Sequence, residues 1–544
     1  MRFYDREEMK ELTLRDAQKK MAEAVAKVAR EGGRILINDP PGTGKTLGVI
    51  AGLAEVGVRA LALVPNRPII SVWERFEAYT DDGEVYRFVG IRSKREFPCL
   101  INEGLSAWSI HVACNMDLSN ADKAAKCRYY APPLPDSGKL SLPVYGRYLS
   151  FNGAPWVVHT REAVCPYYDQ FKAYADGENI VMTYDKFFME AASGRLPKFD
   201  VLVLDEIDAG WGQMYKKLAL TSDLLRGLLR QLKEKGASGE DAVMEVLGEV
   251  LIAVEQGVVP SNLKELEQAL RIAARRLELE MVVPALNSAK VIDKQKGKVV
   301  FLLDHSRLVN AVGAKAVVYL TGTPMSDDEA KELFRTERTV LNKRQMGRFV
   351  LLKGGEIKVK GIWFKDWRVY KEEVRTYCKK MDENIRKISS AVPTLVPIFS
   401  YRHFEACENV GQPIELYRQY LDKDGRLLQK FAGGEIPVVF SSRAIRGVHF
   451  NFGRMAVVLS KYPFPDLEDE LVRYMMQYNR LRRQLEVVAR STLYQALGRG
   501  VTKDEDVVYV YSPDKRVYEE IGNMSKLFDM TVEEGNEIVL KTGG

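Results

Sequence analysis

The sequence predicts an α/β protein in which two domains are each built on a parallel sheet. Short, continuous apolar runs alternate with helical patterns toward both ends of the chain, which is typical of strands buried on both faces of a parallel sheet. The chain has 544 residues, enough for three or four structural units. The expected strands are 34–38, 60–64, 201–204 and 316–320 in the first half, and 394–399, 437–440 and 456–459 in the second.

A block of helical periodicity interrupts the first set of strands at 211–297. One expected helix places leucines on a single face and ends at Gly236, and a second begins behind Asn262 as a plausible N-terminal cap. Strand-like runs resume after this block. We therefore expect a helical insertion within the first α/β domain.

The composition excludes several classes of protein. Charged residues make up 28% and hydrophobic residues 46% of the chain, an ordinary globular mixture, and a net charge of +6 is too diluted to predict a polyanionic partner. No apolar stretch is long enough for a membrane span, and the N-terminal residues lack the apolar core of a signal peptide. Six cysteines are too sparse for a disulfide-stapled secreted scaffold. We expect a soluble protein, cytoplasmic or nucleoid-associated, or nuclear in a eukaryote.

A glycine-containing loop at 39–46, D-P-P-G-T-G-K-T, follows the strand at 34–38 and precedes an apolar helix. Such a loop turns backbone N–H groups and a helix N-terminus toward a phosphate, while the lysine reaches the β- and γ-phosphates and the threonine reaches Mg²⁺. Asp39 replaces the first glycine of the strict motif, so the match is to its looser form; the alternative is a chance surface turn. The predicted nucleotide-binding residues here are Pro41, Gly42, Thr43, Gly44, Lys45 and Thr46.

Two acids, Asp205 and Glu206, follow the expected strand 201–204 at its carboxyl end, the ligand-binding edge of a parallel sheet. With a phosphate loop in the same chain, Asp205 is predicted to join Thr46 in holding Mg²⁺, and Glu206 to position the attacking water. Two acids after a strand are also common where a helix begins, and this alternative has less weight beside the phosphate loop.

Four cysteines gather between these two motifs, and Cys378 and Cys407 lie far downstream. Four thiolates are the usual ligands of a [4Fe–4S] cluster. No C-x-x-C pair is present, so a zinc site or four unrelated buried cysteines remain alternatives. The predicted metal ligands are Cys99, Cys114, Cys127 and Cys165.

On these motifs, the chain resembles the XPD/DinG group of iron–sulfur superfamily 2 DNA helicases; the segments 90–99 and 164–168 are similar to the group's first and last cysteine segments. The resemblance implies two RecA-like P-loop domains, with an iron–sulfur cluster domain and a helical arch inserted in the first. The implied bounds are 1–90, 171–210 and 298–345 for helicase domain 1, 91–170 for the cluster domain, 211–297 for the arch and 346–544 for helicase domain 2.

Further segments extend this resemblance over most of the chain. The segment 14–18 is similar to the group's adenine-recognising segment, with Gln18 as the reader, and Gln495 and Arg499 stand in its motif VI. Similarity at other motifs covers 62–66 (Ia), 320–324 (III), 441–450 (V), the P-F-P turn at 462–465 and the D-x-R at 514–516. The implied catalytic residues are Lys45, Asp205, Glu206 and Arg499.

Three positions depart from the group's pattern. His449 replaces the acid of motif V, Arg446 replaces the glutamate before its glycine, and Thr502 replaces the second arginine of motif VI. These changes bear on how hydrolysis is coupled to movement more than on nucleotide binding. Arg499 is retained as the candidate γ-phosphate finger.

The resemblance also implies a nucleic-acid partner, because Arg95 matches an arginine that in the group lies beside the cluster and contacts DNA. Tyr167 and Tyr168 are predicted to stack on bases. We therefore predict an ATP-dependent DNA helicase that uses ATP, Mg²⁺ and a [4Fe–4S] cluster, moves 5′→3′ on single-stranded DNA and unwinds forked DNA. The alternative is a nucleic-acid-binding protein whose ATPase has decayed or acts as a switch.

Overall fold

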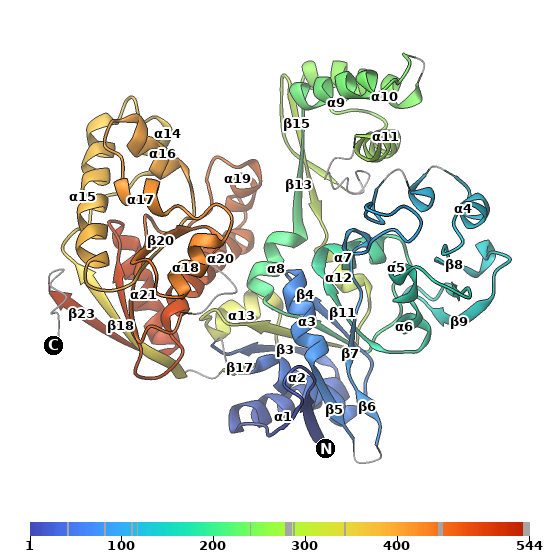
Figure 1. The fold of residues 1–544 in the computed structure, drawn as a ribbon, viewed down its shortest axis with the longest axis horizontal. Coiled ribbons are helices and arrows are strands. Elements are labelled where there is room, and N and C mark those ends of the chain that lie inside the picture. The colour runs from blue at the N-terminus through green and yellow to red at the C-terminus, as the bar shows by residue number, and fades with distance from the viewer. Residues whose placement is uncertain are drawn as a thin grey trace.

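The computed structural model describes residues 1–40, 43–80, 83–109, 112–116, 118–239, 241–277, 286, 289–341, 344–443 and 450–536. Two parallel sheets form the centres of two domains (Figure 1). The first has seven strands in the order β17-β3-β16-β12-β4-β11-β7. Its strands are β3 (Gly33–Asn38), β4 (Ala60–Val64), β7 (Phe88–Gly90), β11 (Asn179–Thr183), β12 (Val201–Leu204), β16 (Ala316–Thr321) and β17 (Arg338–Leu341).

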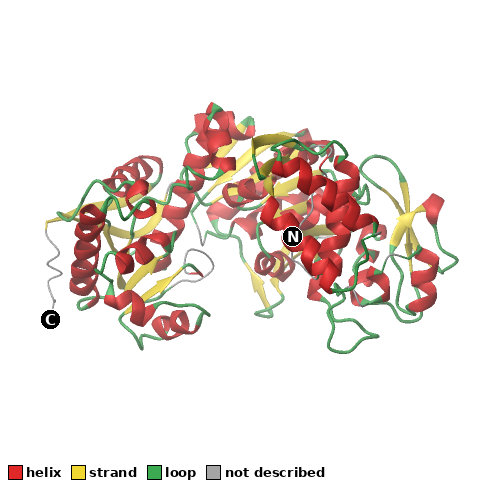
Figure 2. Cartoon of the chain, turned by 90° about the horizontal axis from the view of Figure 1, so that it is seen from above, coloured by secondary structure: helices red, strands yellow, loops and turns green. Residues whose placement is uncertain are grey.

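The second sheet has six strands in the order β20-β19-β21-β22-β18-β23, again with parallel pairing throughout. Seen from above, the two domains lie side by side along the long axis (Figure 2). The strands are β18 (Arg344–Lys353), β19 (Thr394–Pro397), β20 (Val438–Ser441), β21 (Arg454–Val458), β22 (Val507–Tyr511) and β23 (Asp529–Asn536). The predicted α/β class with two such domains is confirmed.

Successive residues of the central strands pack into separate cores on the two faces of the first sheet. Leu61 and Leu63 of β4 enter one core, while Ala60 and Ala62 enter the other, and all of them are fully buried. This alternation is the period of two expected of a strand. It explains why the strands read as continuous apolar runs, since neither face meets water.

The segment between β7 and β11 forms a separate unit that we call the cysteine domain, residues 91–178 (Figure 1). Its antiparallel sheet has the order β8-β10-β9. The elements are β8 (Pro133–Pro135), β9 (Val144–Leu149), β10 (Pro155–His159), α4 (Asn120–Lys126), α5 (Pro166–Asp169), α6 (Lys172–Ala175), and the 3₁₀ turns η1 (Lys94–Glu96), η2 (Ala113–Asn115) and η3 (Asp136–Gly138).

The insertion after β12 carries three helices on an antiparallel sheet of order β13-β15-β14. The sequence placed 298 onward with helicase domain 1, but β15 pairs with β13 and β14 instead of with the parallel sheet. Its apolar run is buried within this smaller sheet, and Gly297, at φ 78°, permits the tight turn from β14. The elements are β13 (Tyr215–Thr221), α9 (Ser222–Glu234), α10 (Ala242–Glu255), α11 (Leu263–Arg276), β14 (Lys290–Gln295) and β15 (Lys298–Asp304).

The remaining strands form a separate antiparallel sheet of order β2-β1-β5-β6, and the remaining helices pack around the sheets. No helix in the described ranges is long and apolar enough to span a bilayer. They are β1 (Arg2–Asp5), β2 (Lys10–Leu12), α1 (Asp16–Glu31), α2 (Lys45–Val56), α3 (Arg67–Arg75), β5 (Phe76–Tyr79), β6 (Val85–Tyr86), α7 (Tyr184–Ala192), α8 (Ile207–Met214), α12 (Ser306–Ala311), α13 (Asp327–Phe334), α14 (Gly361–Lys365), α15 (Lys371–Ser389), α16 (Arg402–Asn409), α17 (Glu415–Tyr420), α18 (Arg426–Ala432), α19 (Glu470–Met476), α20 (Asn479–Leu497), η6 (Gly498–Gly500) and α21 (Lys515–Leu527).

A disulfide joins Cys378 of α15 to Cys407 of α16 in the second domain. Both side chains are fully buried in the core. This bond could not be predicted from the sequence, because the two residues lie 29 positions apart and on separate helices.

Candidate nucleotide site and cysteine domain

The phosphate loop connects β3 to α2, as predicted. Gly44 has a left-handed φ of 85°, a conformation that favours glycine, and Nε2 of Gln18 lies against the position that a Cβ atom would occupy. The ammonium group of Lys45 donates hydrogen bonds to the carbonyl oxygens of Asp39 at 2.7 Å and Pro40 at 3.1 Å. The lysine therefore lies over the backbone of the loop. The predicted residues Pro41 and Gly42 lie outside the described residues.

Gln18 lies beside this loop and is buried. Its amide oxygen accepts a hydrogen bond from the Arg15 backbone N–H at 2.8 Å, and its Nε2 donates to the Gly44 carbonyl at 3.3 Å. Arg15 also donates to the Thr43 carbonyl at 2.6 Å. The start of α1 thus supports the loop, and the role of Gln18 in reading adenine stays a prediction.

The two predicted acids follow β12 directly. The Asp205 carboxylate is buried and accepts hydrogen bonds from the Trp73 indole N–H and the Glu206 backbone N–H, both at 2.9 Å. Burial raises the pKa of Asp205 above its usual value, and the bond from Trp73 opposes that rise. Glu206 adopts a left-handed backbone conformation, φ 43° and ψ 53°. Strained backbone of this kind concentrates at functional sites.

Lys45 and the acids share one electrostatic environment. Burial lowers the pKa of the Lys45 ammonium group, and the carboxylates that oppose this shift are led by Asp39 and followed by Asp205 and Glu206. The structure thus brings together the lysine of the loop and the acids of β12, which the sequence places about 160 residues apart. A cation beside two acids at the carboxyl edge of a sheet suits a Mg²⁺–phosphate ligand.

Asp208 is a further polar residue of this site that sequence reasoning missed. Its buried carboxylate accepts hydrogen bonds from the hydroxyls of Thr321 at 2.9 Å and Thr323 at 3.1 Å, and from the hydroxyl of Ser491 on α20. The signal was present, because Asp208 closes the run D-E-I-D and the two threonines lie in the segment predicted as motif III. One carboxylate therefore links both domains.

The helix α20 leads to Gln495 and Arg499 and packs against the first domain. Arg490 forms an ion pair with Glu329 of α13 at 2.9 Å, and Arg499, which is buried, donates to Oε1 of Gln495 at 2.9 Å. Burial raises the pKa of Tyr494, and the Asp39 carboxylate adds to the rise. The ion pair of Arg490 thus holds α20 against the first domain, and Arg499 follows α20 in the turn η6.

The structure describes one of the three departures from the group's pattern. The Thr502 hydroxyl donates to Asp506 at 2.9 Å, and the same carboxylate accepts the backbone N–H of Thr502 at 2.6 Å. Thr502 therefore stabilises a turn. Arg446 and His449 lie outside the described residues.

The four predicted cysteine ligands all belong to the cysteine domain and are free thiols. Burial raises the pKa of the Cys127 thiol, and interactions with Cys114, Cys165 and Cys99 add to the rise. Burial likewise raises the pKa of Cys165.

Backbone N–H groups point at several of these sulfur atoms. Cys99 accepts from the backbone N–H of Asn102 at 3.4 Å, and backbone hydrogen bonds from Tyr129 to Cys127 and from Tyr167 and Tyr168 to Cys165 partly oppose the rise that burial causes in the pKa of those two thiols. Such donors favour the thiolate form that an iron–sulfur cluster needs. Within the described ranges, no set of three or more His, Cys, Asp or Glu side chains is arranged to hold a single metal ion. The iron–sulfur cluster and the zinc alternative therefore both stay predictions.

The three predicted DNA-contacting residues differ in how far they are exposed. Arg95 is half-buried and lies 4.9 Å from the ring centre of Trp108. Tyr167 and Tyr168 are only 8% and 6% exposed and pack edge-to-face against each other and their neighbours in the core. Both rings are therefore largely covered by protein, and base stacking on these two tyrosines stays a prediction.

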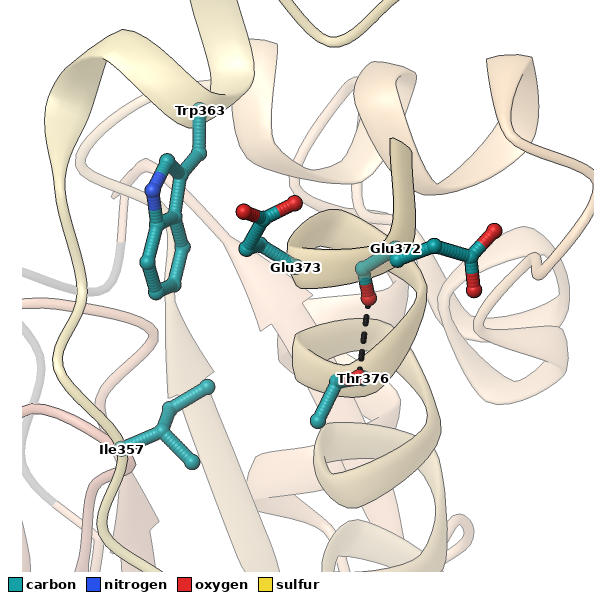
Figure 3. Close-up of a pocket in the computed structure, with 5 residues that line it drawn as sticks. All are labelled: Ile357, Trp363, Glu372, Glu373 and Thr376. Atoms are coloured by element: carbon teal, nitrogen blue, oxygen red, sulfur yellow. Dashed lines mark hydrogen bonds between the residues drawn. The ribbon is translucent and has the colours of Figure 1, made fainter. Parts of the chain in front are cut away.

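A separate cavity of about 340 Å³ lies in the second domain (Figure 3). Trp363 and Ile357 form one wall, and Glu373, Glu372 and Thr376 of α15 form the other; the Thr376 hydroxyl donates to the Glu372 carbonyl at 2.8 Å. The cavity shares no residue with the nucleotide site.

Comparison with solved structures finds XPD helicases among the structures similar to this chain. One XPD helicase matches with a TM-score of 0.58 and 16% identity, covering 96% of this chain and 100% of that one. An apo XPD matches at 0.53 and 14%, covering 95% and 100%, and Xpd4 of S. tokodaii at 0.53 and 12%, covering 96% and 100%. No protein-family model and no curated protein matches the sequence. The chain has the XPD helicase fold over nearly its whole length.

Proposed function

We propose that this protein is an ATP-dependent DNA helicase that moves 5′→3′ on single-stranded DNA and separates duplex strands. The proposal is carried by Lys45 on the loop after β3, by Asp205 and Glu206 directly after β12, and by the hydrogen bond from Ser491 that holds the helix leading to Arg499 against Asp208 of the first domain. This arrangement suits phosphoryl transfer, which needs positioning and charge neutralisation more than covalent chemistry. The XPD helicase fold supports the same reading.

The residues of the site have distinct tasks in this proposal. On ATP binding, the Lys45 ammonium group exchanges the carbonyls of Asp39 and Pro40 for the β- and γ-phosphates. Thr46 and Asp205 would hold Mg²⁺, which neutralises phosphate charge. Glu206 orients the attacking water, and Arg499 reaches the γ-phosphate from the second domain. Closure with ATP and opening after hydrolysis would advance the single strand.

The cysteine domain is proposed to hold a [4Fe–4S] cluster on Cys99, Cys114, Cys127 and Cys165. When bound, the cluster would tie four separate segments of this domain together. Anaerobically purified protein should be yellow-brown with about four irons per chain. Cys127→Ser should bleach it while Cys407→Ala should not, and stoichiometric zinc without iron would decide for the zinc alternative.

Strand displacement on duplexes with a 5′ or a 3′ tail tests the helicase proposal directly. We expect ATP-dependent unwinding of the 5′-tailed substrate only, and none by Lys45→Ala. Unwinding restricted to the 3′-tailed duplex would overturn the direction. Failure on both duplexes, with no DNA-stimulated ATP turnover, would overturn the function.

A second candidate is a nucleic-acid-binding protein that uses ATP as a switch. It is favoured by Thr502, whose side chain serves a turn with Asp506 where a second arginine is expected. This candidate predicts that ATP binding changes DNA affinity without DNA-stimulated hydrolysis. Measuring both quantities on the same preparation separates the two functions.

A further inference from the structure

A buried tryptophan holds the acid that is proposed to bind Mg²⁺. Trp73 lies on α3, its side chain is fully buried, and its indole N–H donates to Oδ2 of Asp205 at 2.9 Å. The other carboxylate oxygen, Oδ1, accepts the backbone N–H of Glu206 at 2.9 Å. Each oxygen of the Asp205 carboxylate therefore has its own N–H donor, and one of the two donors comes from a helix 132 positions away.

The pairing of two strands brings Trp73 to Asp205. β4 and β12 are parallel neighbours, and the Asp205 backbone N–H donates to the carbonyl of Leu63 on β4 at 2.8 Å. α3 follows β4 in the chain, and its two buried residues, Ile70 and Trp73, are three positions apart and share one face of the helix. This face packs on the sheet and carries the indole to the point where Asp205 follows β12.

The indole ring is held firmly in this position. It packs edge-to-face against Phe88 of β7, with the ring centres 4.9 Å apart, and both rings belong to the same buried core. Close-packed core side chains keep one rotamer, so the direction of the indole N–H is fixed. The Tyr184 hydroxyl also donates to the backbone carbonyl of Asp205 at 3.1 Å. Both the side chain and the backbone of Asp205 are thus restrained by aromatic residues of the first domain.

The donor set at this edge of the sheet fits Mg²⁺. The predicted ligands are the Thr46 hydroxyl and the Asp205 carboxylate, and oxygen atoms are the ligands that Mg²⁺ prefers. A carboxylate has about four acceptor positions, so the two N–H donors leave acceptor capacity on both oxygens of Asp205. Because Mg²⁺ demands nearly octahedral geometry, its affinity depends on how such a ligand is oriented.

We propose that Trp73 is a positioning residue for the metal, because its indole N–H fixes the Asp205 carboxylate in the orientation that binds Mg²⁺. This role rests on the proposed function, in which Mg²⁺ accompanies ATP. It goes beyond that function because Trp73 lies outside every motif predicted from the sequence. An apolar ring could pack against Phe88 as well, but it would leave the carboxylate free to turn.

Mn²⁺ binding to the full chain in the presence of ADP tests this role, with the EPR signal of free Mn²⁺ as the readout. Mn²⁺ prefers the same oxygen ligands as Mg²⁺. Trp73→Phe keeps an aromatic ring beside Phe88 but removes the donor, so the Kd for Mn²⁺ should rise by about 10- to 100-fold, as for other partners that orient a metal ligand. Binding of a fluorescent ATP analogue in excess EDTA should not change, since the contacts of Lys45 need no metal.

Trp73→His makes the opposite change. The imidazole can overlay the five-membered ring of the indole and keep an N–H donor at the same place, whereas the benzene ring is lost. At about pH 8, where an ordinary imidazole is neutral, Trp73→His should bind Mn²⁺ more tightly than Trp73→Phe. It should also melt at a lower temperature than Trp73→Phe, because the missing ring leaves a cavity. A residue that acts only through packing would give the same order in both measurements.

Trp156 provides the matched control, because it is a buried tryptophan of the cysteine domain that stacks on Tyr148. Trp156→Phe should bind Mn²⁺ like the wild type. The Mg²⁺ dependence of ATP turnover gives a second readout. Trp73→Phe should need more Mg²⁺ for half-maximal turnover and should recover most of the wild-type kcat at saturating Mg²⁺, whereas Trp156→Phe should follow the wild-type curve.

A wild-type Kd for Mn²⁺ in Trp73→Phe, or a Trp73→His variant that binds Mn²⁺ no better than Trp73→Phe, overturns the inference and leaves the helicase proposal intact. So does a loss of turnover that saturating Mg²⁺ does not recover, joined to weaker ATP binding in EDTA, because this pattern marks a misshapen site. If the wild type with ADP binds no more Mn²⁺ than ADP alone and hydrolyses no ATP, the proposed function fails as well.

Discussion

At the scale of single residues, Lys45 and Glu206 should fail for different reasons when changed. Lys45→Ala removes the ammonium contact to the β- and γ-phosphates, so ATP binding should weaken together with hydrolysis. Glu206→Gln keeps the shape of the side chain but loses the carboxylate that orients water, so ATP should stay bound and unhydrolysed. Equilibrium binding of a fluorescent ATP analogue beside a steady-state ATPase assay separates the two effects.

An exposed lysine provides the control for this pair. Lys19 of α1 forms only an exposed ion pair with Asp16 at 3.4 Å, so Lys19→Ala should leave binding and turnover unchanged. Near-normal turnover in either Lys45→Ala or Glu206→Gln would contradict the assignment of the site.

The sequence predicted the position of site residues in the fold but not the burial of their neighbours, and the roles of these residues stay predictions. Lys45, Asp205 and Glu206 were placed correctly at the edge of a parallel sheet, because strand ends can be read from apolar runs. The sequence cannot report that Tyr167 is covered by Phe97 and Phe171. Nor can it report that Trp73 donates to Asp205, since that bond joins residues 132 positions apart.

At the scale of elements, the sheet of the insertion is clasped to α19 of the second domain. Lys217 of β13 and Lys298 of β15 both pair with Glu470, the former at 2.9 Å. These contacts hold the pKa of Glu470 down at about 2, chiefly through the hydrogen bond from Lys298. The Lys290 ammonium group adds a contact 4.8 Å from the ring centre of Tyr474.

Glu470→Gln should therefore loosen this clasp. Because the folded-state pKa lies below the usual 4.5, the stabilisation is present above about pH 4.5 and is lost as the pH falls toward 2. We expect the free energy of unfolding to fall by about 1–2 kcal/mol at pH 7, with faster proteolysis of the insertion. A double-mutant cycle with Lys298→Met should give a coupling energy that shrinks in high salt.

The exposed pair Arg230 and Glu234 within α9 serves as the comparison for the clasp. Glu234→Gln should lower the free energy of unfolding by less than about 0.5 kcal/mol, because exposed ion pairs one helical turn apart contribute little to stability. If the changes in unfolding free energy of Glu470→Gln and Lys298→Met are additive, the coupling energy is zero and the ion pair does not stabilise the contact.

The disulfide between α15 and α16 is a second element-scale contact. Closing a loop of 29 residues lowers the conformational entropy of the unfolded chain. In the chain-entropy model this raises the free energy of unfolding by about 3–4 kcal/mol. The double variant Cys378→Ala/Cys407→Ala should thus melt about 7–14 °C lower than the wild type under non-reducing conditions.

Thiol counting checks the bond independently of stability. After denaturation with a chelator and without reductant, alkylation followed by mass spectrometry should label Cys99, Cys114, Cys127 and Cys165 but neither Cys378 nor Cys407. Labelling of all six cysteines would contradict the disulfide. Prior reduction under denaturing conditions is the positive control and should label all six.

Element prediction was strongest for the parallel strands and weakest where pairing is non-local. The runs at 60–64 and 201–204 became β4 and β12 with the predicted bounds, since continuous apolar sequence suits a strand buried on both faces. The run that became β15 has the same texture but pairs with the insertion's own strands. A continuous apolar run indicates that a strand is buried, whereas the strand with which it pairs depends on tertiary contacts.

At the scale of the whole molecule, α20 connects the two domains. It begins in the second domain's chain segment, donates from Ser491 to Asp208 of the first domain, pairs Arg490 with Glu329, and ends beside Arg499. Asp208 also accepts hydrogen bonds from Thr321 and Thr323. The helix that leads to the predicted arginine is therefore bonded to the same carboxylate as these two threonines of the first domain. The full-length similarity to XPD helicase structures fits this arrangement.

The proposed mechanism therefore depends most strongly on Arg499. An arginine supplied across a domain cleft can contribute about 10³–10⁵ in turnover, because it neutralises charge developing on the transferred phosphoryl group. Since Thr502 is engaged with Asp506, Arg499 should carry nearly all of this effect. We expect Arg499→Ala to abolish DNA-stimulated ATPase while single-strand binding persists, because Arg499 is buried beside Gln495 and the DNA path would run through other residues. Arg499→Lys should recover little, since an ammonium group lacks the planar fork of guanidinium. Wild-type turnover by Arg499→Ala beside an inactive Lys45→Ala would show that hydrolysis needs no residue from the second domain, and the nucleotide-switch function would then take the place of the helicase.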